Sequence, residues 1–168
     1  MVRIMRASVV DAQEILELQK LAYLDEAAIY DDYTIAPLHQ SLAEMEQDMR
    51  QQIVLKAVEG EGIVGSVRGH ARDGTCFIGR LIVHPDFQNR GIGRQLVAEI
   101  EGCFAGIQRY ELFTGQRSQK NLHLYLKLGY RPLRMQRFSD KVTLVYLEKV
   151  IDMMSGSKVG TDAPSSGQ

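Results

Sequence analysis

The chain has 168 residues, of which 45% are hydrophobic and 24% are charged, and its formal net charge is −1. This length predicts one domain with a sizeable core, and the composition is that of a soluble globular protein. A net charge so close to zero provides no basic field that would draw the chain to nucleic acid. No apolar run reaches the length of a membrane span, and the N-terminus does not resemble a signal peptide.

The cysteines and histidines match no metal-binding pattern. Cys76 and Cys103 lie far apart in the sequence, and the four histidines form no pair at ligand spacing. We therefore expect no bound metal. Two unpaired thiols indicate a reducing compartment, so we expect a cytoplasmic protein.

The first half of the chain predicts one strand, two helices and a β-hairpin. Residues 2–6 alternate as in a strand, and Ser8 with Asp11 resembles a capping box at the start of the first helix. A second amphipathic helix is predicted at about 38–50. Two runs joined by a Gly-containing turn predict the hairpin, at 53–60 and 62–72.

The second half alternates strands with helices. A strand follows the turn at Asp73-Gly74 and is stopped by Pro85. The next helix starts at a glycine-rich loop and runs to about Phe104, and a later, shorter helix ends at Gly129. The remaining strands are predicted at 109–115, 131–138 and 141–150.

These elements predict one domain at 1–151, followed by a tail at 152–168. The tail is small, polar and contains Gly and Pro, so it cannot bury enough apolar surface to order itself and is expected to be flexible. The order of the elements in the domain predicts an α/β (α+β) fold. We expect a mixed, largely antiparallel central sheet flanked by helices.

The most informative stretch is QNRGIGR, residues 88–94, between a predicted strand and a predicted helix. A helix N-terminus exposes unpaired N–H groups and a partial positive charge. Gly91 and Gly93 let the backbone approach an anion closely, and Arg90 and Arg94 add positive charge. The stretch therefore predicts a pyrophosphate-binding loop, although the two glycines are also compatible with a simple turn.

Three kinds of phosphate-binding loop can be compared with this stretch. A Rossmann fingerprint requires a third glycine where Leu96 stands, and a P-loop requires Gly-Lys-Ser/Thr, which is absent. The pattern Q-x-x-G-x-G, after a strand ending in LIVHP, resembles the acyl-CoA pyrophosphate loop of the GNAT superfamily. These proteins are acyl-CoA-dependent N-acetyltransferases.

A second resemblance to GNAT enzymes lies in SQKNLHLYLKLGYRP. Such enzymes commonly carry a short helix with a tyrosine a few residues before a closing Gly-Tyr, as in Tyr125 and Gly129-Tyr130. Asn121 lies one helical turn before Tyr125, so both can face one groove, although Tyr125 also fits a core position. Many relatives have asparagine where this chain has Ser118, which can still cap the helix. Either Ser118 or Asn121 is then the contact to the pantetheine arm.

The resemblance covers about residues 2–150 and implies transfer of an acetyl group from acetyl-CoA to an amine. It implies that the fourth and fifth strands splay apart to admit the cofactor. A backbone N–H near Val83 would stabilise the developing oxyanion, a contribution of about 3 kcal/mol. The implied cofactor-binding residues are Leu81, Ile82, Val83, Gln88, Asn89, Arg90, Gly91, Ile92, Gly93, Arg94, Ser118 and Asn121.

The resemblance also implies that Tyr125 is the catalytic acid. A phenol with its ordinary pKa of about 10 can protonate a leaving thiolate. No motif identifies the base: Glu111 and His70 are candidates, although each also fits an ordinary structural role. Arg117 and Lys120 either lie near the adenosine phosphates or are solvated surface charges.

The acceptor is predicted only as a primary amine of a small molecule or peptide. The acidic and aromatic segment 24–33 is expected on the acceptor side, where it would attract a cationic amine, or else it is a solvent-facing helix end. A homodimer is possible. The alternatives are a non-catalytic acyl-CoA-binding or sensory module, and a different nucleotide-binding protein.

Overall fold

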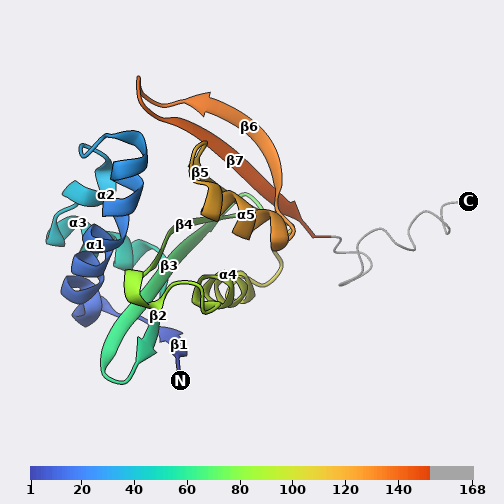
Figure 1. The fold of residues 1–168 in the computed structure, drawn as a ribbon. Helices are drawn as coiled ribbons and strands as arrows, with labels where there is room; N and C mark the ends of the chain where they lie inside the picture. Colours follow the sequence, from blue (N-terminus) through green and yellow to red (C-terminus); the bar gives the residue numbers. More distant parts are fainter. Residues whose placement is uncertain (152–168) are drawn as a thin grey trace, which may run out of the picture.

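A seven-stranded sheet runs through the molecule in the order β1-β2-β3-β4-β5-β7-β6 (Figure 1). The structure is a computed structural model that describes residues 1–151, and the tail predicted at 152–168 lies outside the described residues. All neighbouring strands are antiparallel except β4 and β5, which are parallel. This confirms the predicted mixed, largely antiparallel sheet. The strands are β1 (Arg3–Arg6), β2 (Ile53–Glu59), β3 (Gly62–Arg72), β4 (Thr75–Val83), β5 (Arg109–Gly115), β6 (Arg131–Arg137) and β7 (Thr143–Val150).

Helices cover both faces of this sheet. The group α1 to α3 lies on one face, and α4 and α5 lie on the other (Figure 1). Within residues 1–151, none of the helices combines the length and the apolar character that a bilayer span needs. The helices are α1 (Ala12–Tyr30), α2 (Ala36–His39), α3 (Leu42–Gln51), α4 (Ile92–Gly102) and α5 (Gln119–Lys127).

Each face of the sheet has its own apolar core. On one face, α4 buries Leu96, Val97 and Ile100, spaced so that all three point toward the strands. On the other face, Ile15 of α1 and Met45 of α3 pack against the first strands. The sheet is thus the central layer between two cores, and the site lies where this layer is interrupted.

The helix predicted at 38–50 is in fact two helices. Ser41 begins α3: its Oγ accepts from the Glu44 N–H at 3.1 Å, while the Glu44 carboxylate accepts from the Ser41 N–H at 2.9 Å. This is a capping box, a pattern that the sequence contains and that the prediction overlooked. The box predicted at Ser8 is confirmed, since its N–H donates to Asp11 at 2.9 Å, but a 3-10 turn at Val9–Asp11 precedes α1.

The parallel strands β4 and β5 pair only at one end. Their register covers Thr75–Phe77 of β4 against Arg109–Glu111 of β5, and beyond these residues the strands separate. In the separated part, Arg80 and Leu81 of β4 stand opposite the single residue Val67 of β3, which makes a β-bulge. The predicted splay of the fourth and fifth strands is therefore present.

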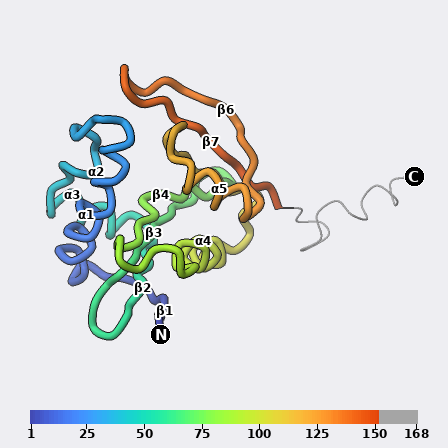
Figure 2. Tube along the Cα trace, in the orientation of Figure 1, coloured from blue at the N-terminus to red at the C-terminus, as the bar shows by residue number. Residues whose placement is uncertain are grey.

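The β6–β7 hairpin extends past the other strands (Figure 2). Its tip approaches the end of α1, where Nζ of Lys141 donates a hydrogen bond of 2.6 Å to the carbonyl of Asp31. β6 is the edge of the sheet, and all seven of its residues are exposed.

Candidate active site

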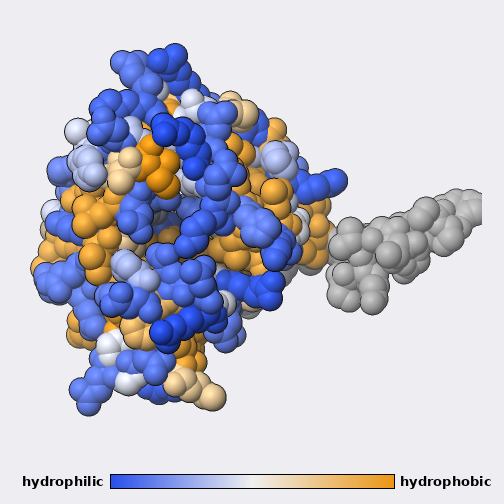
Figure 3. Space-filling view, in the orientation of Figure 1, coloured by the Kyte–Doolittle hydropathy of each residue, from blue (hydrophilic) through white to orange (hydrophobic). Residues whose placement is uncertain are grey.

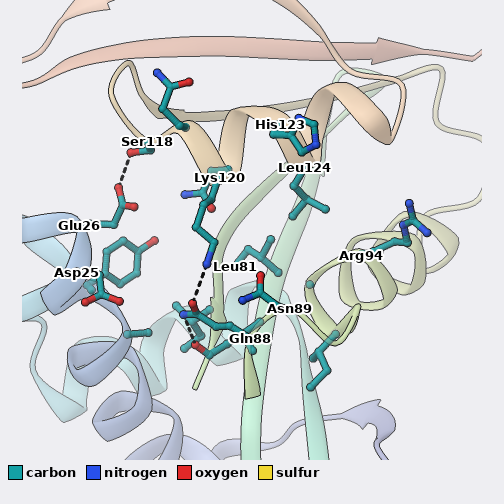
Figure 4. A pocket seen from close by; sticks show the side chains of 18 of the residues that line it. Asp25, Glu26, Leu81, Gln88, Asn89, Arg94, Ser118, Lys120, His123 and Leu124 are labelled. Carbon is teal, nitrogen blue, oxygen red and sulfur yellow. Dashed lines mark hydrogen bonds between the residues drawn. The ribbon is translucent and has the colours of Figure 1, made fainter. Parts of the chain in front are cut away.

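A cavity of about 670 Å³ occupies the place where β4 and β5 separate (Figure 4). Its walls are one face of α1, the end of β4, the loop that leads into α4 with the first turn of that helix, and one face of α5. In the space-filling view, this face of the molecule is hollowed between largely hydrophilic side chains (Figure 3). The cavity is therefore formed by four segments that lie far apart in the sequence.

Most of the predicted cofactor-binding residues line this cavity. The exception is Arg90, whose guanidinium lies over the ring of Phe87 at 4.9 Å from its centroid. Arg90 is exposed, and this stacking explains why its side chain stays on the outside of the loop. The predicted residues that line the cavity are Leu81, Ile82, Val83, Gln88, Asn89, Gly91, Ile92, Gly93, Arg94, Ser118 and Asn121.

The glycine loop caps α4 with a left-handed residue. Gly91 has φ = +83° and stands directly before the helix, and a Cβ at this position would meet no atom within 4 Å. Glycine is thus required here by backbone conformation and not by crowding. At Gly93, a Cβ would lie 3.5 Å from a methyl group of Leu124 across the cavity, so this glycine keeps the space between α4 and α5 open.

Positive charge gathers around the end of the cavity near α4 and α5. Arg94, Lys120 and Lys127 line the cavity there, whereas the guanidinium of Arg117 lies over the ring of Tyr30 of α1, 5.6 Å from its centroid. Lys120 also crosses the opening, because its Nζ donates to Oε1 of Gln88 at 3.1 Å (Figure 4). Together with the free N–H groups at the start of α4, these side chains make this end suited to an anion such as a pyrophosphate.

Ser118 does not cap α5 with its side chain. It is buried, and its Oγ donates to Oε1 of Glu26 on α1 at 2.6 Å. The Tyr30 hydroxyl lies 2.8 Å from the same Oγ and accepts from the N–H of Arg117 at 2.9 Å. Because the single hydroxyl proton of Ser118 is given to Glu26, the Tyr30 hydroxyl is the donor to Ser118. A chain of donors therefore leads to the Glu26 carboxylate.

Of the two candidate contacts to a pantetheine arm, Asn121 makes fewer side-chain hydrogen bonds than Ser118. Its Nδ2 donates to Oγ1 of Thr114 on β5 at 3.2 Å, and its side-chain oxygen has no hydrogen bond within the described residues. Ser118, by contrast, already has partners on both sides. The geometry thus favours Asn121 for an amide contact.

Tyr125 is more deeply buried than a simple cavity-lining residue. It is 6% exposed, and its ring packs against that of Tyr130 with 6.1 Å between the centroids. Burial raises the pKa of its phenol well above the ordinary value, and nearby Tyr23 and Glu26 add to the increase. The assumption of an ordinary phenol pKa is therefore wrong. Tyr125 itself is not among the residues that line the cavity, whereas Asn121 and Leu124 of the same helix are, so Tyr125 lies behind the cavity wall.

With this geometry in view, comparison with known proteins identifies the chain. A family model described as an acetyltransferase (GNAT) domain matches residues 50–132, which include β4, the glycine loop and α5. The chain belongs to the GNAT superfamily. A comparison with curated protein sequences gives no match.

Solved structures share the fold of this GNAT protein over almost their whole length. PaiA N-acetyltransferase from Thermoplasma acidophilum, in complex with coenzyme A, has a TM-score of 0.75 at 16% identity, covering 89% of this chain and 99% of that one. YncA from Salmonella typhimurium, solved with acetyl-CoA, has a TM-score of 0.69 at 23% identity, covering 90% and 95%. Ribosomal-protein-alanine N-acetyltransferase from Brucella melitensis gives 0.69 at 17%, covering 89% and 99%. At such identities the likeness shows the GNAT fold alone.

Neither predicted base candidate of this GNAT protein lies at the cavity. Glu111 is paired with Arg109 at 2.6 Å and with Arg134 at 3.5 Å, so its charge is already neutralised. His70 is stacked on Phe77, with 5.4 Å between the ring centroids. Neither residue is among those that line the cavity, so the structure gives neither of them a place in the site.

The acidic and aromatic segment 24–33 is divided between two places. Asp25 and Glu26 line the GNAT cavity, whereas Asp31 and Asp32 lie at the end of α1. There, Asp32 accepts hydrogen bonds from the backbone N–H and hydroxyl of Thr34 at 2.9 and 2.6 Å. The segment is thus not one continuous acidic rim, because one helical turn separates its two halves.

Glu26 is the functional candidate that the sequence prediction treated only as part of a charged rim. Its carboxyl is half-buried in the cavity wall, and burial raises its pKa, with a further increase from the charge of Asp25 and an opposing decrease from the hydrogen bond of Ser118. A carboxyl group in such a setting is a candidate proton acceptor. Nothing in the local sequence marks it, because its environment depends on contact with α5.

No cluster of three side chains suited to hold a metal ion occurs within residues 1–151. The lining of the cavity offers a carboxyl group, a phenol, backbone N–H groups and surface cations. These groups can hold an anion, receive a proton and donate to a developing negative charge.

Proposed function

We propose that this GNAT protein transfers an acetyl group from acetyl-CoA to a primary amine of a small molecule or peptide, by direct attack of the amine on the thioester. The observation that carries the proposal is the cavity between the separated strands β4 and β5, which ends at the glycine-capped start of α4. Bound acetyl-CoA would supply the activated acetyl group. Every other role falls to residues of the chain.

The first role is to hold the phosphates. The N–H groups that follow Gly91 at the start of α4 have no partner inside the helix, and Arg94 and Lys127 stand beside them. The backbone is left-handed at Asn89, with φ = +64°, and at Gly91. These two residues turn the loop around the proposed anion site.

The second role is to hold the pantetheine arm and to stabilise the developing negative charge. Residues 78–83 of β4 have β3 as a neighbour on one side but no strand on the side of β5. Their backbone groups on that side are available for strand-like hydrogen bonds to an extended amide chain. A donor in this segment, near Val83, would act on the carbonyl oxygen and would contribute about 3 kcal/mol.

The third role is proton transfer. Glu26 would accept the proton of the attacking amine, because its carboxyl lies in the cavity wall with a raised pKa. Tyr125 would donate to the leaving thiolate. Its raised pKa keeps the phenol protonated throughout the neutral range, so it acts as a hydrogen-bond donor at every working pH.

Release of CoA thiol from acetyl-CoA tests the proposal, measured against a panel of amino acids, polyamines, aminoglycosides and short peptides. A blank without acceptor is required, because Cys103 is exposed; Cys76 is buried, and burial raises the pKa of its thiol to about 12. Release with one class of amine supports the proposal. Acetyl-CoA binding without release for any amine favours the non-catalytic acyl-CoA-binding module, and absence of binding contradicts both.

We also propose a cytoplasmic protein, supported by the two free thiols. The possible homodimer stays a prediction. The exposed edge strand β6 offers a surface for it, and sedimentation analysis would test it.

A further inference from the structure

A second, smaller cavity of about 300 Å³ lies on the α1–α3 side of β4. The short helix α2, the start of α3 and the β-bulge of β4 form its walls. It is separate from the large cavity, with which it shares no lining residue. The residues that line it are Ala36, His39, Gln40, Glu44 and Arg80.

Arg80 brings a half-buried positive charge to this cavity without a carboxylate partner. Its Nη1 donates to the neutral side-chain oxygen of Gln40 at 3.0 Å. Among residues 1–151, no carboxylate oxygen lies within 4.0 Å of its guanidinium. Glu44, the acidic residue of the same cavity, accepts from the N–H of Ser41. A guanidinium has five N–H donors, and most of those of Arg80 remain available.

The position of the Arg80 guanidinium is fixed by a buried network around Gln40. The amide oxygen of Gln40 also accepts from Nε2 of Gln19 at 2.9 Å, and its Nε2 donates to Asp48 at 2.6 Å. The side-chain amide of Gln40 therefore makes three hydrogen bonds, to Gln19 of α1, Asp48 of α3 and Arg80 of β4, and these bonds fix its orientation. A guanidinium held in this way presents its remaining donors in one geometry.

The nearest carboxylate of the network, that of Asp48, is engaged by other partners and does not pair with Arg80. Asp48 pairs with Arg68 at 3.0 Å, so its carboxylate is shared with a second guanidinium. Burial lowers the pKa of Arg68, and repulsion by Arg80 lowers it further. Glu44 lines the same cavity, but its carboxylate lies within 4.0 Å of neither guanidinium. A guanidinium that is partly removed from water without a contacting carboxylate is costly, and a ligand carboxylate in contact with it would offset that cost.

Arg80 also stands next to the region where transfer would occur. It directly precedes Leu81, which lines the large cavity, and its φ of +48° is left-handed, a strained conformation for an arginine. Such strain often persists at functional positions. Tyr23 lines the large cavity, and burial raises the pKa of its phenol. The positive charge of Arg80 acts in the opposite direction and lowers this pKa.

We propose that Arg80 binds a carboxylate of the acceptor, so that the acceptor is an amine that also carries a carboxylate, as in an amino acid. This inference rests on the proposed acetyltransferase function. A carboxylate matches the bidentate geometry of a guanidinium whose remaining donors have no partner among residues 1–151. Polyamines and aminoglycosides, which carry only positive charge, would be repelled by Arg80 and Arg68.

The test compares kcat/KM for pairs of acceptors that differ only in the carboxylate, such as glycine with glycinamide and alanine with alaninamide. The wild type is expected to prefer the free acid over the amide after correction for the fraction of free amine. Arg80→Gln is expected to reduce this preference roughly ten- to a hundredfold, mostly through KM, whereas Arg80→Lys retains part of it. Arg50→Gln, which removes an exposed arginine of α3, is the matched control and leaves the preference unchanged.

A second variant covers the case in which Arg80→Gln does not fold. Ala36→Asp adds a carboxylate to the rim of the cavity at an exposed position in the first turn of α2, and it is expected to reduce the same preference. Ala28→Asp, at an exposed position of α1, is its control. Equal use of acids and amides by the wild type, or a preference unchanged in both Arg80→Gln and Ala36→Asp, would overturn the inference.

A binding measurement separates this inference from the proposed function. Calorimetry measures the affinity of the wild type and of Arg80→Gln for three compounds, each added separately: acetyl-CoA, N-acetylglycine and N-acetylglycinamide. Binding of N-acetylglycine that weakens at least tenfold in Arg80→Gln supports the carboxylate site even if no amine is acetylated. Normal binding of acetyl-CoA with equal binding of the acid and its amide leaves the proposed function in place and removes the carboxylate site.

Discussion

Ser118, at the start of α5, donates a hydrogen bond of 2.6 Å to Glu26 on α1 across the cleft of the large cavity (Figure 4). The bond joins residues 92 positions apart in the sequence. It holds the wall formed by α1 against the segment that follows β5. It also orients the Glu26 carboxyl, so the same contact contributes to the shape of the cavity and to its chemistry.

Replacing Glu26 by Gln should slow acetyl transfer about 10²- to 10⁴-fold, because a positioned proton acceptor is lost while the side-chain oxygen can still accept from Ser118. A base must be ionised, and burial raises the pKa of this carboxyl above the ordinary 4.5. The acidic limb of the wild-type kcat/KM profile should therefore lie at a higher pH than for an ordinary carboxyl, and it should vanish in Glu26→Gln.

Two observations control the Glu26 prediction. Asp25→Asn removes a charge that raises the Glu26 pKa, so the acidic limb should move to lower pH while transfer persists. The raised pKa of the Glu26 carboxyl stabilises the fold only at low pH, and this stabilisation is lost as the pH rises through the pKa of the folded state. Glu26→Gln should therefore not lower the melting temperature at pH 7. A full rate in Glu26→Gln contradicts the assigned role.

Position 115 requires glycine, because the hydroxyl end of Tyr30 occupies the place that a Cβ at this position would take. In Gly115→Ala, Tyr30 must move, and its bonds to Ser118 and to the N–H of Arg117 are lost. The free energy of unfolding should fall by about 1–3 kcal/mol, as in other overpacked positions. Urea denaturation measures it. Gly102→Ala in α4, where a Cβ meets no atom within 4 Å, should be neutral or stabilising; equal values for both variants would contradict the prediction.

Gly91→Glu should abolish binding of acetyl-CoA, because it adds bulk and a negative charge where the pyrophosphate is proposed to lie. Gly74→Glu is a matched control, since both glycines are left-handed, at φ = +83° and +82°, and neither has an atom near its missing Cβ. Gly74 lies in the turn between β3 and β4, away from the cavity. Calorimetric binding that survives in Gly91→Glu would refute the assignment of the loop.

Tyr125→Phe should bind acetyl-CoA as the wild type does but turn over about ten- to a thousandfold more slowly, because only the donor to the thiolate is removed. Since burial raises the phenol pKa, the loss should be constant across the neutral range. Tyr146→Phe, on β7 beside Phe113, removes a hydroxyl elsewhere and should have no effect. Full activity in Tyr125→Phe would return this residue to a purely structural role.

Local sequence determined most of the fold and the anion-binding end of the cavity. A helix N-terminus preceded by Gly91, a strand stopped by Pro85 and a helix closed by Gly129 each depend on neighbours within a few positions. Backbone conformation and hydrogen bonding within one segment decide such features, so they can be predicted from the local sequence. The capping box at Ser41 is also a local feature that the sequence contains.

Only the tertiary structure decided which charged groups meet. Glu26 becomes a half-buried carboxyl because α1 packs against Ser118. Arg80 has no carboxylate partner among residues 1–151, and the nearby Asp48 pairs with Arg68. The bulge that places Arg80 depends on the register between β3 and β4, which no local periodicity encodes. Burial, pKa and pairing arise from segments brought together across the sheet, and so the acceptor side of the site is specified by packing and not by motif.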